Sequence, residues 1–68
     1  MSTVIITKEN FNSIVGENQL VILDFWASWC GPCLQFAPTY EEASEKHTDV
    51  VFGKINTEEE EELAAFFN

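Results

Sequence analysis

Two cysteines, Cys30 and Cys33, are the residues of this sequence with the clearest chemistry, and the chain has no other cysteine. Gly31 and Pro32 separate them. Residues three apart lie on one face of a helix, close enough for the geometry of a disulfide. Two thiols at this spacing can close into a small disulfide ring and open again. The spacing therefore indicates redox chemistry.

The two thiols are expected to differ in acidity. The pattern places Cys30 at the N-terminus of a helix and Cys33 one turn inside it. Unpaired N–H groups and the positive end of the helix dipole stabilise a thiolate at the first position, so Cys30 should be the more acidic thiol. Pro32 suits the first helical turn because its φ is preset and no N–H is needed there. Gly31 has no side chain and leaves a substrate room to approach.

A mechanism follows from this arrangement. The Cys30 thiolate attacks a substrate disulfide, and Cys33 then attacks the Cys30 sulfur, which leaves a Cys30–Cys33 disulfide and a reduced substrate. Asp24 is the candidate base for Cys33, because desolvation in an otherwise apolar strand should raise its pKa. Lys54, on a neighbouring strand, would set the charge around Asp24. Trp29 offers a flat apolar surface to a partner.

Three short apolar runs predict the strands that must position these residues, at residues 3–6, 20–26 and 50–56. The run at 20–26 is apolar on both faces except for Asp24, as in a parallel sheet covered by helices. Residues 27–29 then form a loop that leads to the cysteines.

Helical spacing predicts three helices between and after the strands. Thr7 is the candidate N-cap of the first helix and Gly16 its stop. The second helix contains both cysteines and Pro38, where we expect a kink. Residues 57–60 form a predicted capping box for the third helix. The order β-α-β-α-β-α predicts one small α/β domain with parallel crossovers.

Composition excludes several classes of function. The net charge is −9, with three lysines and no arginine, so the chain lacks the basic patch of a nucleic-acid-binding protein and is disfavoured at anionic membranes. No apolar run approaches the roughly 18 residues of a membrane span, and the first residues lack a basic leader. We therefore expect a cytoplasmic protein. In that compartment a lone cysteine pair is more often catalytic or metal-binding than structural.

Plainer interpretations of the same residues stay open. The cysteines are alternatively two buried structural thiols, or part of a zinc site, which needs about four ligands and so a dimer. Asp24 is alternatively a hydrogen-bonded core acid, and Lys54 an ordinary strand lysine. His47 is expected at a helix C-terminus without a catalytic role. Residues 58–62 are expected to begin a solvated helix, and no metal site is expected.

These residues together resemble the thioredoxin family. The segments that carry the resemblance are Asp24-Phe25-Trp26-Ala27, Trp29-Cys30-Gly31-Pro32-Cys33, Ala37-Pro38 and Gly53-Lys54-Ile55-Asn56. The resemblance implies a thioredoxin-like fold and a reductase of protein disulfides, with Cys30 as nucleophile, Cys33 as resolving thiol and Asp24 as buried acid. It also implies that no cofactor is bound and that a dedicated reductase supplies the electrons.

Two departures from the family pattern stand out. The residue after the second cysteine is commonly basic in the family and here is Leu34, which should shift the pKa of Cys30 upward and alter the choice of partner. A family domain also continues with a cis-proline loop, two strands and a helix, and neither Pro32 nor Pro38 can take the role of that proline. We therefore expect residues 1–68 to form one thioredoxin-like domain that is truncated at its C-terminus.

The expected truncation leaves one edge of the strand at residues 20–26 bare, which is a hazard for unwanted strand pairing. Three outcomes are open. The natural chain is longer, or the sheet is completed by a second copy in a homodimer or domain swap, or the chain folds only loosely. The alternative function is then a non-catalytic half-domain that dimerises or binds a partner through its open sheet edge.

Overall fold

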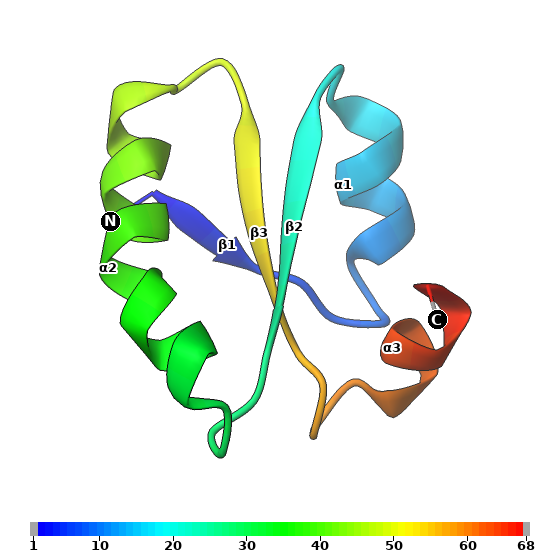
Figure 1. Ribbon diagram of the computed structural model, residues 1–68. Coiled ribbons are helices and arrows are strands. Elements are labelled where there is room, and N and C mark those ends of the chain that lie inside the picture. The colour runs from blue at the N-terminus through cyan, green and yellow to red at the C-terminus, as the bar shows by residue number, and fades with distance from the viewer. Residues whose placement is uncertain (1, 68) are drawn as a thin grey trace.

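The computed structural model describes residues 2–67. In chain order the elements are β1 (Thr3–Ile5), α1 (Phe11–Glu17), β2 (Val21–Trp26), α2 (Gly31–Lys46), β3 (Val51–Asn56) and α3 (Glu61–Phe67). The β-α-β-α-β-α order predicted from the sequence is thus confirmed. All strand pairs are parallel, and the sheet has the order β1-β3-β2 (Figure 1). Of the helices in residues 2–67, none is both long and apolar enough to cross a membrane.

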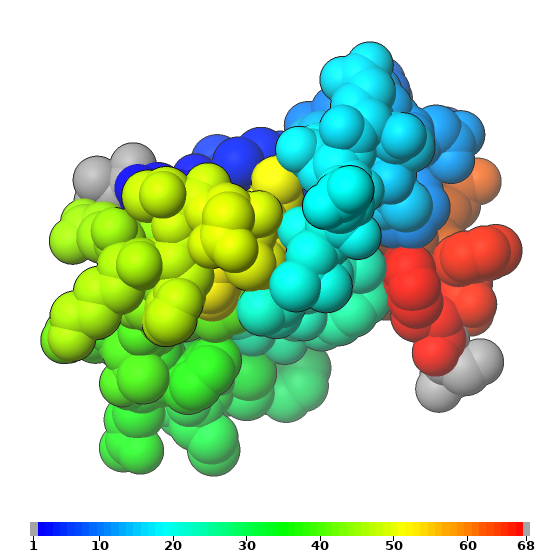
Figure 2. Space-filling model, turned by 90° about the horizontal axis from the view of Figure 1, so that it is seen from above, coloured from blue at the N-terminus to red at the C-terminus, as the bar shows by residue number. Residues whose placement is uncertain are grey.

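The sheet separates two helical layers. Figure 1 shows α2 on one face of the sheet and α1 with α3 on the other, and the view from above shows the same division (Figure 2). Because successive side chains of a strand point to opposite faces, each strand contributes to both layers. Phe52 of β3 meets Tyr40 of α2, with ring centroids 5.3 Å apart. The Tyr40 hydroxyl lies 2.8 Å from the Gly53 carbonyl oxygen and 3.0 Å from that of Ile22, and it donates its one proton to this pair of acceptors.

The fully apolar core lies on the α1 and α3 side of the sheet. Ile6, Ile55 and Leu63 are buried there, and they are packed against by partly buried side chains of α1, β1 and β2. Gly53 permits this packing, because a Cβ at that position would lie only 2.6 Å from Cγ1 of Ile6. The close approach of the Ile6 side chain to β3 therefore requires glycine at residue 53.

The predicted ends of α1 are wrong. The N-cap of α1 is Asn10, three residues after the predicted Thr7, and the Asn10 side chain makes no capping hydrogen bond to the helix. Thr7 and Asn10 bond each other in the manner of a capping box: the Thr7 hydroxyl accepts the Asn10 N–H at 3.3 Å, and the Asn10 side-chain oxygen accepts the Thr7 N–H at 2.7 Å. These bonds close a turn before α1, so the helix begins later than predicted. Gly16 does not stop the helix either, since α1 continues to Glu17.

The predicted capping box before α3 is also wrong. The hydroxyl of Thr57 donates to the Trp26 carbonyl at 3.2 Å, and the Glu60 carboxylate accepts the backbone N–H of Lys8 at 2.9 Å. Both side chains thus bind distant parts of the chain instead of capping each other, and α3 begins at Glu61. The acidic first turn that the dipole favours is present.

The strand β2 lies at one edge of the sheet, where β3 is its hydrogen-bonded neighbour among the described residues. It is less buried than a strand covered on both faces, since Ile22 is 41% exposed and the preceding Leu20 is 55% exposed. This position explains why an almost wholly apolar strand is only half-buried along most of its length.

Candidate redox site

The two cysteines are joined in a disulfide at the start of α2. Cys30 is the N-cap residue, and the backbone N–H of Cys33 donates to its sulfur at 3.3 Å. After reduction, the Cys30 sulfur would stay beside this donor and at the positive end of a helix of 16 residues. Both effects stabilise a thiolate. The local structure thus favours Cys30 as the nucleophile.

The surface beside Cys30 is open. Gly31 and Pro32 form the first turn of α2, and a Cβ at Gly31 would meet nothing within 4 Å. Trp29 is 77% exposed, although it is one of the largest apolar side chains in the chain. These three residues leave the surface around Cys30 accessible.

Cys33 is placed against the end of β2. Its sulfur lies 4.0 Å from the backbone carbonyl oxygen of Phe25, and the residue is half-buried. A disulfide sulfur has no proton to donate, so this contact becomes a weak hydrogen bond only in the reduced thiol. Cys33 is therefore packed against the end of β2, whereas the Cys30 sulfur lies at the N-terminus of α2.

Asp24 lies on the α2 face of the sheet and is paired in register with Lys54 of β3. Burial raises the pKa of the Asp24 carboxyl, and the positive charge of Lys54 partly offsets this increase. This is the direction expected for a carboxylate in an apolar strand. Asp24 is thus a group that holds its proton more readily than an ordinary aspartate.

Lys54 and Tyr40 complete the polar surroundings of Asp24. The Lys54 ammonium lies 5.5 Å from the centre of the Trp26 ring, within the range of a cation–π interaction. Burial, and to a smaller extent the charge of Asp24, raise the pKa of Tyr40 to about 12. Tyr40 was not singled out from the sequence. The available signal was its position two turns after Cys33 on the same helix face.

Sequence reasoning also missed a contact between Ser28 and Glu58. The backbone N–H and the hydroxyl of Ser28 both donate to one carboxylate oxygen of Glu58, at 3.0 and 2.8 Å. The available signal was the parallel pairing itself, because neighbouring parallel strands end at the same edge of a sheet. Figure 1 shows the loops after β2 and β3 together at that edge.

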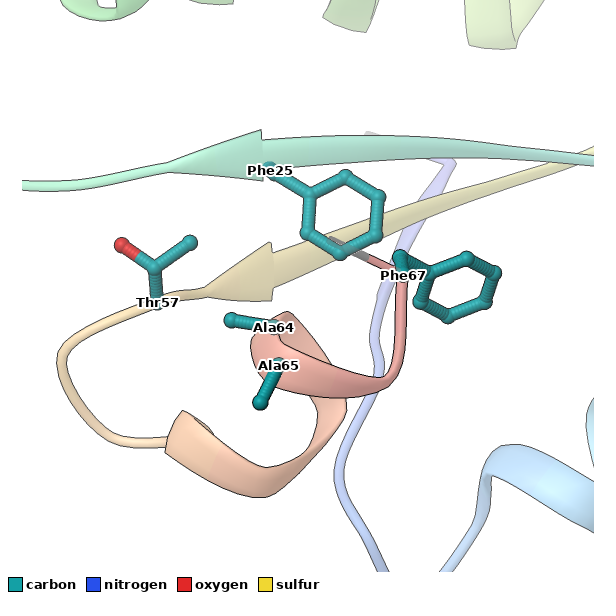
Figure 3. Close-up of a pocket in the computed structure, with 5 residues that line it drawn as sticks. All are labelled: Phe25, Thr57, Ala64, Ala65 and Phe67. Atoms are coloured by element: carbon teal, nitrogen blue, oxygen red, sulfur yellow. The ribbon is translucent and has the colours of Figure 1, made fainter.

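An apolar pocket of about 430 Å³ lies on the other side of β2 from this chemistry. Figure 3 shows the Phe25 ring projecting from the strand toward Phe67 of α3, with Thr57, Ala64 and Ala65 completing the lining. The two rings pack edge to face at 5.3 Å. The pocket contains no titratable side chain.

Within residues 2–67, no group of three or more potential ligand side chains (His, Cys, Asp, Glu) is placed to hold a metal ion.

Asp24→Asn should make the fold more stable at neutral pH and leave it unchanged in acid. The raised pKa means that ionised Asp24 costs stability, and this cost grows as the pH rises through the pKa of the folded state. Below the pKa of the unfolded state both forms are protonated and the cost vanishes. Urea unfolding of the parent and Asp24→Asn from about pH 3 to pH 7 measures the difference.

Asp49→Asn serves as the control in this series, since it removes one negative charge from an exposed position outside the sheet. A stability gain for Asp24→Asn that stays constant across the pH range would contradict the burial of an ionisable carboxyl.

Comparison with known proteins gives the family. The thioredoxin family model matches residues 2–68. A putative thioredoxin 2 of Streptomyces coelicolor is 58% identical over 66 residues, which are 97% of this chain and 49% of that protein. Thioredoxin 1 of Plasmodium falciparum is 44% identical over 63 residues, covering 93% of this chain and 61% of its own.

Solved structures agree with the sequence comparison. A structure of Plasmodium falciparum thioredoxin superimposes with a TM-score of 0.89 at 46% identity, over 94% of this chain and 64% of that one. A thioredoxin f2 in complex with ferredoxin:thioredoxin reductase gives 0.90 at 34% identity, over 98% and 64%. The chain therefore spans about half to two thirds of the relatives it matches. The protein belongs to the thioredoxin family.

Proposed function

We propose that this chain carries the active dithiol of a thiol-disulfide oxidoreductase that reduces protein disulfides. The observation that carries the proposal is the Cys30–Cys33 disulfide at the start of α2, with the Cys33 N–H directed at the Cys30 sulfur. Disulfide exchange needs a stabilised thiolate and access for a second disulfide, and the helix N-terminus and the exposed neighbours of Cys30 provide both. Family membership supports the same chemistry.

The proposed reaction has two exchange steps. In the reduced chain, the Cys30 thiolate attacks one sulfur of a substrate disulfide, the substrate S–S bond breaks, and the other substrate sulfur leaves and takes a proton. Cys33, once deprotonated, attacks the Cys30 sulfur. The mixed disulfide breaks, the second substrate thiol is released, and the Cys30–Cys33 bond forms. Two electrons have then passed from the chain to the substrate.

Asp24 is the proposed acceptor of the Cys33 proton. Its raised pKa makes it a better base than an ordinary aspartate, and it shares the α2 face of the sheet with the cysteine helix. Lys54 modulates this role, because its charge opposes the effect of burial on Asp24. The carboxylate and the ammonium together set the proton affinity behind the dithiol.

The proposed partners are protein disulfides and a reductase that returns two electrons to the disulfide, with no bound cofactor. Trp29, Gly31 and Pro32 would contact the substrate, and their exposure around Cys30 supports this role. Leu34, 50% exposed, extends the apolar surface. The similar thioredoxin f2 was solved with a reductase, which supports a partner of that kind.

The strongly acidic composition argues against nucleic acid or anionic membranes as partners, and a cytoplasmic location is part of the proposal.

Cys33→Ser should trap the mixed disulfide, and Cys30→Ser should abolish reaction. Without Cys33 the first exchange still occurs but nothing resolves it, so a covalent complex with a disulfide substrate such as insulin accumulates. Without Cys30 no complex forms, and turnover with dithiothreitol falls at least about a hundredfold. Non-reducing electrophoresis and an insulin turbidity assay measure both. Equal turnover of the parent and Cys30→Ser would refute the proposal.

The same assay tests whether Asp24 acts on the second exchange step, in which Cys33 attacks the Cys30 sulfur. Asp24→Asn should prolong the lifetime of the mixed disulfide severalfold, while the rate at which it forms stays near that of the parent. Equal slowing of both steps would show that Asp24 does not act on Cys33 in particular.

A second candidate function is pairing through the edge of β2. The observation that favours it is the exposure of Ile22 in β2 and of Leu20 just before it, since β2 has one neighbouring strand among the described residues. An apolar strand edge of this kind is a template for a further strand, and a second copy of the chain offers the same edge. In this proposal the chain forms a homodimer.

Ile22→Lys should dissociate such a dimer, because a charge on the exposed part of β2 opposes edge-to-edge pairing. Ile5→Lys is the matched control: Ile5 is also exposed, but it lies on β1 at the opposite edge of the sheet. Light scattering after size exclusion gives the mass. A monodisperse, folded monomer for the parent chain would rule out pairing as a requirement for folding.

A further inference from the structure

Glu58 is bonded to the loop that carries Cys30, although it lies in a different part of the chain. Its Oε1 accepts both donors of Ser28, the N–H at 3.0 Å and the hydroxyl at 2.8 Å. Ser28 stands two residues before the nucleophile. We refer to these two hydrogen bonds as the Ser28 clamp. Hydrogen bonds to a charged acceptor are stronger than those between neutral groups.

Glu58 is itself held in place by the end of β3. Its backbone N–H donates to the side-chain oxygen of Asn56 at 2.9 Å. The preceding residue is also fixed, because the Thr57 N–H donates to the carbonyl of Trp26, the last residue of β2, at 2.9 Å. The Glu58 carboxylate thus belongs to a segment that is hydrogen-bonded to the ends of both β2 and β3. The Ser28 clamp therefore fixes the loop relative to the sheet.

The loop has few other restraints between β2 and α2. Ala27 is buried, whereas Ser28 and Trp29 are exposed. The Cys30 N–H donates to the Ala27 carbonyl at 3.1 Å and closes a turn around Ser28 and Trp29. The Ser28 clamp joins this turn to Glu58, which lies after β3. Its loss would leave the turn attached mainly at its two ends.

We propose that Glu58 is a positioning residue that acts through Ser28 to hold Cys30 at the N-cap of α2, within reach of Cys33. This inference rests on the proposed function of the dithiol. A loop held in one place keeps the two sulfurs close, and closeness raises the effective concentration of one thiol toward the other. The clamp therefore favours the closed disulfide over the open dithiol.

The charge of Glu58 is maintained by the same contacts. Hydrogen bonds from the Ser28 backbone, and then from its hydroxyl, lower the pKa of the Glu58 carboxyl. The carboxylate is therefore a persistent acceptor at neutral pH. The hydrogen-bonding role of Glu58 can be separated from its charge by the substitution Glu58→Gln, because glutamine keeps an oxygen acceptor and carries no charge.

The test compares Glu58→Ala with Glu58→Gln in the 68-residue chain equilibrated with reduced and oxidised glutathione. Glu58→Ala should shift the equilibrium toward the dithiol by roughly tenfold, the size of one hydrogen bond to a charged group. It should also speed hydrogen exchange of the Ser28 amide by a similar factor. Glu58→Gln should restore part of both properties, because glutamine keeps the oxygen acceptor but not the charge that strengthens the hydrogen bonds. Ser28→Ala, which loses only the hydroxyl donor, should show a smaller shift.

Glu59→Gln is the matched control, because it removes the same charge one residue away from the clamp. The far-UV circular dichroism of every variant reports on folding. The proposal is overturned if Glu58→Ala leaves the equilibrium and the Ser28 exchange unchanged, or if Glu58→Gln shifts them as far as Glu58→Ala does. A chain that fails to reduce insulin yet shows the expected shifts would refute the proposed function and leave this inference standing.

Discussion

Six residues of β2 pair in parallel with six residues of β3, from Val21 opposite Val51 to Trp26 opposite Asn56. The arrangement of the site depends on this pairing. Because the two strands run in the same direction, the loop before α2 and the turn before α3 leave the sheet at one edge. The first carries Cys30 and the second carries Glu58, so residues far apart in sequence meet around one disulfide.

The same pairing divides the molecule chemically. The α2 face of the sheet carries the titratable residues Asp24 and Lys54 beside Tyr40 and Trp26, whereas the opposite face carries the apolar core around Ile55. Asp24 keeps a raised pKa because burial outweighs the compensating charge of Lys54. The ionised Asp24 carboxylate therefore lowers stability at neutral pH, and groups with raised pKa values of this kind are common at functional sites.

Local signals in the sequence predicted most of the fold and the chemistry of the cysteines. The spacing of Cys30 and Cys33, the apolar runs and the raised pKa of Asp24 need only nearby residues to be recognised. The predicted capping box before α3 was wrong because its side chains bind distant partners. Thr57 binds the end of β2 instead of capping α3, and the Ser28 clamp joins residues 30 positions apart. Such long-range partners follow from the sheet topology, which periodicity along one strand does not specify.

The start of α2 should make Cys30 the acidic, reactive thiol of the pair. The most direct test is the rate of alkylation of the reduced chain by iodoacetamide as a function of pH, with mass spectrometry to locate the modified cysteine. We expect modification first at Cys30, with a pKa below the value of about 8.5 for an ordinary cysteine. Preferential modification of Cys33, or a Cys30 pKa at or above the ordinary value, would contradict it.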